Sequence, residues 1–211
     1  MTQAEPVAGP VTFTYDADGK RVGKATASET KKFIYDFENL LQETDASDTT
    51  QQEYTTTVEE YGDLVSEYDG TSTSYHHYDA LGSTDALTDP AQTSTDTWTY
   101  KAFGEVLPGT GSDATPHAYV GRERYYRDTE TDLCLLGLRY YDADTGQFTS
   151  QDPAEADLNP YRYVWGNPVN ATDPTGLQRC LMLSESPGIN GTCIYLTFYA
   201  AGGSDLVARL G

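Results

Sequence analysis

The dipeptide Tyr-Asp recurs along this chain, and most copies stand beside a turn signal. The copies begin at Tyr15, Tyr35, Tyr68, Tyr78 and Tyr141, and in four of them a glycine follows shortly after the aspartate. An aspartate can accept hydrogen bonds from the backbone of a tight turn, and glycine adopts positive φ without strain. Tyrosine packs well on the face of a sheet. Each unit therefore predicts a strand, a turn and a second strand.

The segments between the repeats alternate as strands do. In residues 11–15, Val11, Phe13 and Tyr15 fall on one face, and in residues 95–100 Trp98 and Tyr100 fall together. The chain holds 17 Tyr against 6 Phe and 2 Trp, which suits half-exposed strands. These patterns predict an all-β protein, an elongated and twisted antiparallel ribbon of hairpins that ends in a compact domain with short helical turns.

Four segments of the chain allow more specific structural predictions. Residues 33–41 fit either a helix face or a hairpin with Glu38-Asn39 in its turn, and the repeat context favours the hairpin. Residues 42–57 predict either a solvated strand pair or a loose loop, and residues 108–116 predict an exposed loop. The basic run at 122–127 predicts a strand whose arginines pair with carboxylates.

The charge balance excludes several classes of partner. The 211 residues carry 13 Lys+Arg against 33 Asp+Glu, a net charge of −20. A phosphate backbone or an anionic membrane surface would be repelled. No apolar run approaches the roughly 20 residues that span a bilayer. The N-terminus lacks a basic region followed by an apolar one, so no signal peptide is expected.

Metal and disulfide signals are weak. Neighbours on a strand point to opposite faces, so His76 and His77 are not expected to share a metal. The segment 16–19 resembles the start of a calcium loop but lacks the later ligands, and we interpret it as a hairpin turn. No metal or cofactor site is predicted. Cys180 and Cys193 either pair or, with Cys134, remain three unpaired thiols.

Five ordered motifs identify a family resemblance. They are Tyr-Asp-Ala-Leu-Gly at 78–82, Tyr-Lys-Ala-Phe-Gly-Glu-Val at 100–106, Tyr-Val-Gly-Arg at 119–122, Leu-Arg-Tyr-Tyr-Asp-Ala-Asp-Thr-Gly-Gln-Phe at 138–148, and Tyr-Arg-Tyr-Val-Trp-Gly-Asn-Pro-Val-Asn-Ala-Thr-Asp-Pro-Thr-Gly-Leu at 161–177. Together they resemble the RHS/YD-repeat family and its RHS-repeat-associated core domain. The resemblance divides the chain into divergent repeats at 1–74, the core domain at 75–177 and a variable C-terminal extension at 178–211.

The resemblance implies a part of a large bacterial toxin or cell-surface protein. In this family the repeats wind into a hollow β-shell, the core domain closes one end, and a C-terminal segment is released inside by self-cleavage. The cleaving machinery resembles an aspartic dyad. By this resemblance Asp152 and Asp173 are the catalytic pair, Leu177–Gln178 is the cleaved bond, and the supporting turn residues are Pro153, Pro174 and Gly176.

The chemistry of such a pair is well defined. Two carboxylates held close together share one proton, so that one can activate water while the other polarises a carbonyl. We expect their side chains to lie within roughly 10 Å of each other. Two positions depart from the family pattern: Gln151 stands where Arg is frequent, and Glu155 replaces a glycine. An Asp-Pro-x-Gly segment is also an ordinary type I turn.

Two functions of different classes follow. In the first, the chain is the C-terminal core of a toxin shell, with its own C-terminal segment as cargo, and at most an intramolecular aspartic-type autoprotease. In the second, it is a non-catalytic surface module that binds carbohydrate or a cell-surface protein, or a truncated remnant. Either one predicts a secreted or cell-surface location within a larger bacterial protein. Open strand edges at the end of the ribbon would favour self-association.

Overall fold

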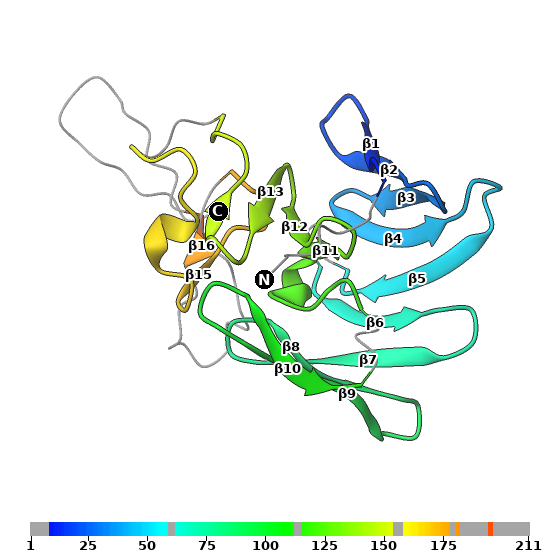
Figure 1. The fold of residues 1–211 in the computed structure, drawn as a ribbon. Helices are drawn as coiled ribbons and strands as arrows, with labels where there is room; N and C mark the ends of the chain where they lie inside the picture. The colour runs from blue at the N-terminus through cyan, green and yellow to red at the C-terminus, as the bar shows by residue number, and fades with distance from the viewer. Residues whose placement is uncertain are drawn as a thin grey trace, which may run out of the picture.

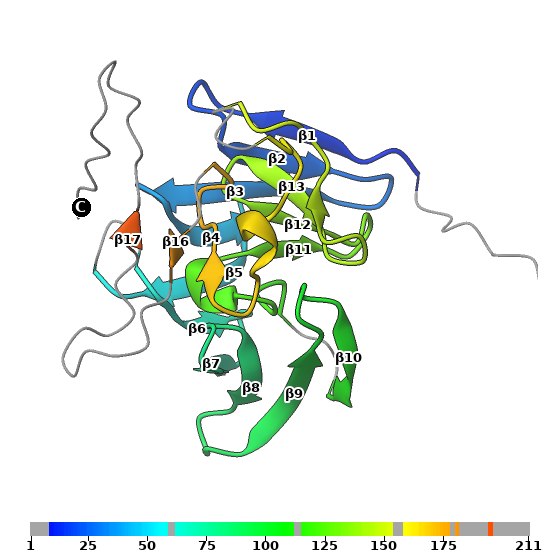
Figure 2. The same ribbon diagram turned by 90° about the vertical axis from the view of Figure 1, so that its left-hand side faces the viewer.

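A long antiparallel sheet dominates the fold. The computed structural model describes residues 9–58, 62–111, 115–153 and 158–177, and the backbone of two short strands at 180–181 and 194–195. Ten consecutive strands pair in chain order to form the sheet, which curves into a ribbon in Figures 1 and 2. This confirms the predicted twisted antiparallel ribbon. The strands are β1 (Thr12–Tyr15), β2 (Arg21–Ala25), β3 (Thr30–Asp36), β4 (Asn39–Thr44), β5 (Thr50–Thr56), β6 (Leu64–Tyr68), β7 (Thr73–Tyr78), β8 (Thr84–Thr88), β9 (Ser94–Tyr100) and β10 (Val106–Thr110).

The aspartates of the repeats hold the turns between these strands. Asp79 Oδ1 accepts hydrogen bonds from the backbone N–H groups of Leu81 and Ser83, both at 2.9 Å. Asp16 Oδ1 does the same for the N–H groups two and four residues ahead, at 3.0 and 2.9 Å. The same type of contact is made by Asp45, Asp69, Asp89 and Asp142. One carboxylate therefore satisfies donors that a tight turn would leave without a partner.

Three tyrosines tie a strand of the ribbon to the strand before it. The Tyr78 hydroxyl at the end of β7 donates to the carbonyl oxygen of Leu64, the first residue of β6, at 2.6 Å. Tyr35 and Tyr100 repeat this contact on β2 and β8, at 3.0 and 2.5 Å. The register shifts next to Tyr35 and Tyr78, as it does at a β-bulge. Bulges increase the local twist, which agrees with the curvature of the ribbon.

Two boundaries differ from the sequence prediction. The hairpin at 33–41 forms, but its turn is Phe37-Glu38, because Asn39 pairs with Asp36 and opens β4. Asn39 is buried, and its Oδ1 accepts hydrogen bonds from Arg124 Nη1 and the Gly62 N–H. Those contacts fix Asn39 in the strand. The predicted loop at 108–116 begins later, since β10 continues to residue 110 as an edge strand, where proline is tolerated.

The fold also places three further segments for which the sequence made a prediction. Residues 42–57 form the strand pair β4–β5. The basic run at 122–127 is not one strand, because Arg124 has a left-handed φ of 64° that ends a short 3-10 helix. The predicted domain boundary at 74–75 falls inside β7, in the middle of the sheet. It stays a prediction about where the sequence similarity changes.

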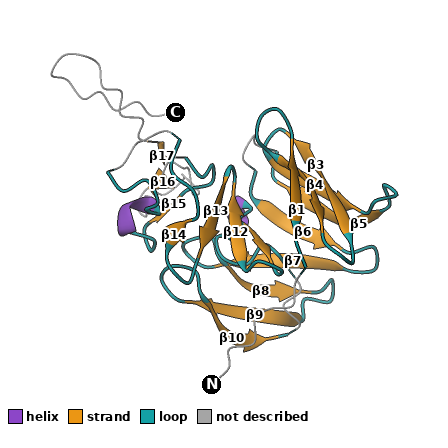
Figure 3. Ribbon diagram, turned by 45° about the horizontal axis from the view of Figure 1, so that its top comes forward, coloured by secondary structure: helices purple, strands orange, loops and turns teal. Residues whose placement is uncertain are grey.

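Two small sheets and two 3-10 helices form the rest of the described chain. The second sheet contains β11 (Tyr126–Asp128), β12 (Leu133–Leu136), β13 (Arg139–Asp142) and β14 (Gln147–Phe148). The third contains β15 (Ala171–Thr172), β16 (Cys180–Leu181) and β17 (Ile194–Tyr195). The helices are η1 (Gly121–Glu123) and η2 (Val164–Gly166), the predicted short helical turns (Figure 3).

The ribbon and the second sheet share a core. Figures 1 and 2 place β11–β13 against the inner side of the ribbon. One cluster of buried side chains joins the two layers: Phe33, Leu40, Tyr54 and Leu64 from the ribbon with Tyr126 and Leu135. A second cluster fills the C-terminal part of the chain: Tyr119, Val120, Tyr125, Cys134, Leu136, Tyr141, Phe148, Tyr163, Val164 and Ala171. The C-terminal part is therefore packed by aromatic residues onto the curved sheet.

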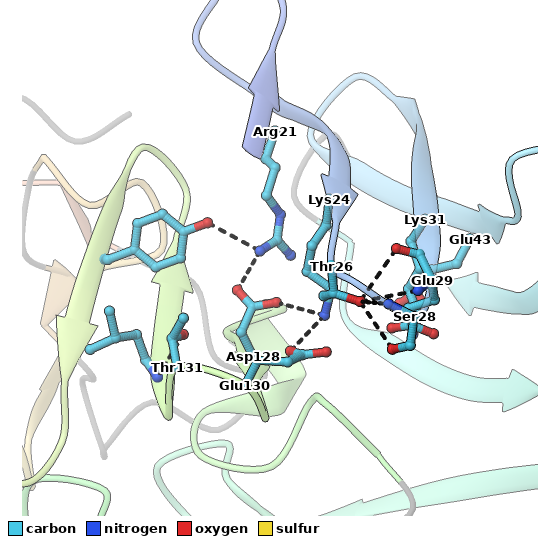
Figure 4. Close-up of polar contacts among 12 residues, drawn as sticks. Arg21, Lys24, Thr26, Ser28, Glu29, Lys31, Glu43, Asp128, Glu130 and Thr131 are labelled. Atoms are coloured by element: carbon cyan, nitrogen blue, oxygen red, sulfur yellow. Dashed lines mark hydrogen bonds and ion pairs between the residues drawn. The ribbon is translucent and has the colours of Figure 1, made fainter. Parts of the chain in front are cut away.

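A buried charge cluster also joins the two layers (Figure 4). Arg21 Nη1 and Lys24 Nζ from β2 both contact the Asp128 carboxylate of β11, and Lys24 also reaches Glu130 at 2.9 Å. Arg21 and Asp128 are 1% and 0% exposed. The guanidinium lies over the Phe33 ring. Burial disfavours the charge of Arg21, but Asp128 raises its pKa above the usual value.

The remaining features of the fold concern its edges. β1 and β10 are the two edge strands of the ten-stranded sheet. Such edges are available for pairing with another strand, so self-association stays a prediction. Within the described residues, no helix combines the length and the apolar character that crossing a membrane requires.

We predict that Tyr78→Phe lowers the free energy of unfolding by about 1 kcal/mol, because the Leu64 carbonyl loses its hydroxyl donor. Urea denaturation measures this value. Tyr75→Phe is the matched control, since Tyr75 lies on the same strand and is 41% exposed. Equal losses in the two variants would contradict the role given to the Tyr78 hydroxyl.

We also predict that Asp128→Asn lowers the free energy of unfolding by about 3–5 kcal/mol, because two buried cations lose their shared carboxylate. Asp132→Asn is the control. Asp132 is paired with Arg127 at 2.6 Å but is 61% exposed, and exposed pairs contribute about 0–1 kcal/mol. A loss below 1 kcal/mol for Asp128→Asn in the same urea experiment would refute this assignment.

Candidate functional site

The segment 173–177 forms a tight turn at the end of β15. The Gly176 N–H donates to the Asp173 carbonyl oxygen at 3.2 Å, as expected for Asp-Pro-x-Gly. Asp173 Oδ1 accepts a hydrogen bond from the Leu177 N–H at 3.1 Å and one from the Thr175 hydroxyl at 3.3 Å. Pro174 occupies the second position of the turn, where its fixed φ is favourable. The Asp173 side chain therefore closes over its own turn.

Glycine is required where this turn meets the β12–β13 hairpin. Gly176 has a φ of 68°, and a Cβ there would lie 2.2 Å from the Leu136 carbonyl oxygen. A Cβ on Gly137 would lie 2.4 Å from the Thr175 carbonyl oxygen, which also accepts the Leu138 N–H at 3.1 Å. The two turns are thus in direct backbone contact. This contact sets the position of the residues up to Leu177.

Asp152 and Asp173 lie on either side of one guanidinium. Arg139 Nη2 is 3.8 Å from Asp152 Oδ2 and 3.6 Å from Asp173 Oδ2. The two Oδ2 atoms cannot be farther apart than the sum of these distances, which is below the separation of roughly 10 Å that the sequence led us to expect. Both aspartates are buried, at 9% and 3% exposure. The Asp152 N–H donates to the Pro160 carbonyl oxygen at 2.9 Å.

Arg139 holds the pair together, and the sequence analysis did not single it out. Its Nε donates to the Gly176 carbonyl oxygen, its Nη1 donates to the Pro160 carbonyl at 3.3 Å, and its guanidinium lies 3.5 Å from the centre of the Phe148 ring. Burial lowers the pKa of Arg139, while Asp152 and Asp173 act to raise it. The Arg139 guanidinium therefore lies close to both carboxylates.

A signal for Arg139 was present in the sequence. Arg139 and Tyr141 alternate on one face of β13, and both are buried. A charged side chain on an apolar face requires a buried counter-ion. Gln151, the residue before Asp152, carries a neutral amide and supplies no positive charge. The guanidinium of this site comes from a different strand.

One peptide group is held at both of its polar atoms. The Gly176 carbonyl oxygen and the Leu177 N–H belong to the same peptide bond, and they bond to Arg139 and Asp173 respectively. Behind them, the Asp173 N–H donates to the Tyr125 hydroxyl at 2.6 Å, which contacts the Tyr163 hydroxyl at 3.0 Å. The bond after Leu177 thus follows a peptide plane whose orientation is fixed.

The other predicted positions are placed as follows. Pro153 adjoins Asp152 at the end of a described range, whereas Glu155 and Gln178 lie outside the described residues. The side chains of Cys180 and Cys193 also lie outside them, so their pairing stays untested. Cys134 is buried, and burial raises the pKa of its thiol to about 12.

The histidines and possible metal ligands follow from the strand geometry. His76 is buried and His77 is exposed, on opposite faces of β7 as predicted. Within the part of the chain that the structure describes, no group of three His, Cys, Asp or Glu side chains is arranged to hold a metal ion.

Comparison with known proteins places these features in context. No protein-family model matches the chain. The tRNA nuclease WapA of Bacillus subtilis is 32% identical over 173 residues, which is 78% of this chain and 7% of WapA. Double-stranded DNA deaminase toxin A of Burkholderia cenocepacia is 27% identical over 232 residues, 90% of this chain and 16% of that protein. The chain thus spans a small part of the length of these relatives.

A solved structure shares the fold. The crystal structure of TcdB2-TccC3 superposes with a TM-score of 0.63 and 24% identity, over 84% of this chain and 10% of the other. It agrees with the long antiparallel ribbon and the packed C-terminal part. The Tyr-Asp hairpins and the sequence relatives point to the same family as this similarity of fold. The chain belongs to the RHS/YD-repeat family of polymorphic toxin proteins.

Proposed function

We propose that this chain is the C-terminal core of an RHS-type shell, and that it releases its own C-terminal segment by cleaving the Leu177–Gln178 bond. The observation that carries the proposal is the peptide group between Gly176 and Leu177, held by Arg139 on its carbonyl and by Asp173 on its N–H. A bond that is to be cut must be presented in one orientation, and fixing the preceding peptide group achieves this.

The residues divide the chemistry between them. Asp173 positions Leu177, and Asp152, which lies across Arg139, serves as the general base for a water molecule. The water oxygen attacks the Leu177 carbonyl carbon and its proton passes to Asp152. The carbon–nitrogen bond to Gln178 then breaks as the leaving nitrogen takes up a proton from an acid, which leaves a carboxyl group on Leu177 and an amine on Gln178. The positive charge of Arg139 favours holding both carboxylates in one site.

The role within a larger protein follows from the family. The nuclease and the deaminase toxin to which the chain is similar are both much longer than it, and the ribbon supports a place at the end of a β-shell. The cargo is then the segment after Leu177. A secreted or cell-surface location belongs to the same proposal. The net charge of −20 supports a partner other than nucleic acid or an anionic membrane.

Self-cleavage predicts a product that ends at Leu177. We expect it when the full chain is refolded from urea and its mass is followed under denaturing conditions. Asp152→Asn and Asp173→Asn should slow its formation by about 10²–10⁴-fold, as expected for a lost general base or a misplaced substrate. Asp144→Asn, an exposed change in the turn before β14, should cleave at the original rate.

The outcomes separate the two function classes. An intact mass after prolonged incubation of the folded, unsubstituted chain would reject cleavage by this chain. It would favour a non-catalytic surface module, which glycan-array binding could then support. Cleavage that persists in both aspartate variants would reject the assigned residues but not the assigned bond.

The turn itself can be tested with two glycines. Gly176→Ala should slow cleavage and lower stability, because its Cβ would meet the Leu136 carbonyl at 2.2 Å. Gly166→Ala is the matched control: Gly166 also has positive φ, at 78°, but a Cβ there meets nothing within 4 Å. Both variants carry a backbone strain of about 1 kcal/mol. Equal cleavage rates for the two would contradict the role of this backbone contact.

A further inference from the structure

A cavity lies beneath the turn that presents the cleaved bond. It has a volume of about 290 Å³ and lies between the ribbon, η1 and the turn. Its lining includes Glu38 and Leu40 from the ribbon, Glu123 from η1, and Pro174 and Leu177 from the turn. Glu123 and the residue before the cleaved bond therefore border the same space.

The Glu123 carboxyl is unusual among the acids of this chain. Its Oε2 is removed from solvent and has no hydrogen-bond partner among the described residues. Its two neighbours in the chain direct their guanidinium groups elsewhere: Arg122 toward Asp63 and Arg124 toward Asn39. A buried carboxylate without a partner is costly, whereas a neutral carboxylic acid is tolerated much better.

The charges around Glu123 agree with a neutral acid. Burial raises its pKa to about 7, with a smaller contribution in the same direction from Asp63, while Thr172, Arg122 and Arg124 act to lower it. A carboxyl group that loses its proton near neutral pH is well suited to donate one.

Glu123 is also connected to the turn through its neighbours. Thr172, which immediately precedes Asp173, interacts with the Glu123 carboxyl. The Tyr125 phenol is influenced by both Glu123 and Asp173, and it accepts the Asp173 N–H. Glu123 and the turn are therefore linked through Thr172 and Tyr125.

We propose that Glu123 is the general acid of the self-cleavage reaction, and that it protonates the nitrogen leaving from Leu177. This inference rests on the proposed self-cleavage. Asp152 is assigned the role of general base and Asp173 positions Leu177, and the leaving nitrogen also needs a proton. As the carbon–nitrogen bond breaks, the Glu123 O–H proton passes to that nitrogen. Glu123 ends as a carboxylate and Asp152 ends protonated, and a proton from Asp152 returns to Glu123 through solvent.

The test compares cleavage rates of the full refolded chain between pH 5 and pH 9. In the unsubstituted chain the rate should fall above about pH 7, as an essential acid loses its proton. Glu123→Gln should cleave about 10²–10⁴-fold more slowly and lack that decline. Glu38→Gln is the matched control, because Glu38 lines the same cavity but is half-buried and paired with Lys20 at 3.0 Å. It should keep the original rate and pH profile.

A stability measurement separates a catalytic role from a structural one. The raised pKa means that the folded chain holds the Glu123 proton which the unfolded chain releases. Its contribution to stability is therefore full below pH 4.5 and is lost as the pH rises toward 7. Glu123→Gln should consequently gain stability relative to the unsubstituted chain between pH 4.5 and pH 8, by up to about 100-fold in the folding equilibrium constant. A purely structural glutamate would lose stability on substitution.

The outcomes distinguish this inference from the function on which it rests. If the unsubstituted chain never cleaves, the proposed function fails. If it cleaves and Asp173→Asn does not, but Glu123→Gln keeps the original rate and pH profile, only the general acid is overturned. If Glu123→Gln does not fold, carbon-13 NMR of Glu123 in the Asp173→Asn chain decides. A pKa near 7 supports the proposal, and one near 4.5 overturns it.

Discussion

Hydrogen bonding at the strand ends is the constraint on which this structure depends. A ribbon of ten short strands has many turns, and every turn exposes backbone donors and acceptors that no neighbouring strand can satisfy. At Tyr78-Asp79 the aspartate accepts the donors of its own turn, and the tyrosine donates to the carbonyl that begins the previous strand. Two adjacent residues there satisfy backbone groups at both ends of a hairpin. The ribbon can then be long without a large apolar core.

The small supply of apolar side chains also explains how the second sheet is attached. Apolar side chains are limited, so aromatic residues and buried cations together join the layers. Arg21 lies over Phe33 and binds Asp128, and Arg139 lies over Phe148 and contacts Asp152 and Asp173. In each case a guanidinium stacks on a ring while its edge contacts a carboxylate. The first cluster joins ribbon and core, and the second joins the strands around the turn.

The candidate site contains this second cluster. The backbone contact between the turn at 173–177 and the β12–β13 hairpin brings Arg139 to the Gly176 carbonyl. That guanidinium also lies close to the carboxylates of Asp152 and Asp173. Glu123 is a buried acid whose Oε2 has no hydrogen-bond partner among the described residues. Two different carboxyl environments near one turn are a suitable basis for distinct acid and base roles.

The sequence by itself determined the all-β class and the position of most hairpins. These features follow from local rules: period-two alternation, turn residues and ordered motifs. Even the errors were small, such as the turn placed at Glu38-Asn39, where Asn39 is held in β4 by Arg124. A contact from a distant residue shifted that boundary, and no local pattern contains such information.

Only the tertiary structure decided which groups meet the aspartates. Arg139 precedes Asp152 in the chain by several residues and Asp173 by many more, and Glu123 belongs to a run that appeared merely basic. Their proximity arises because the second sheet folds into the curve of the ribbon and turns meet backbone to backbone. Local sequence fixes how each residue can bond, but the partners are set by the packing of segments that are far apart in the chain.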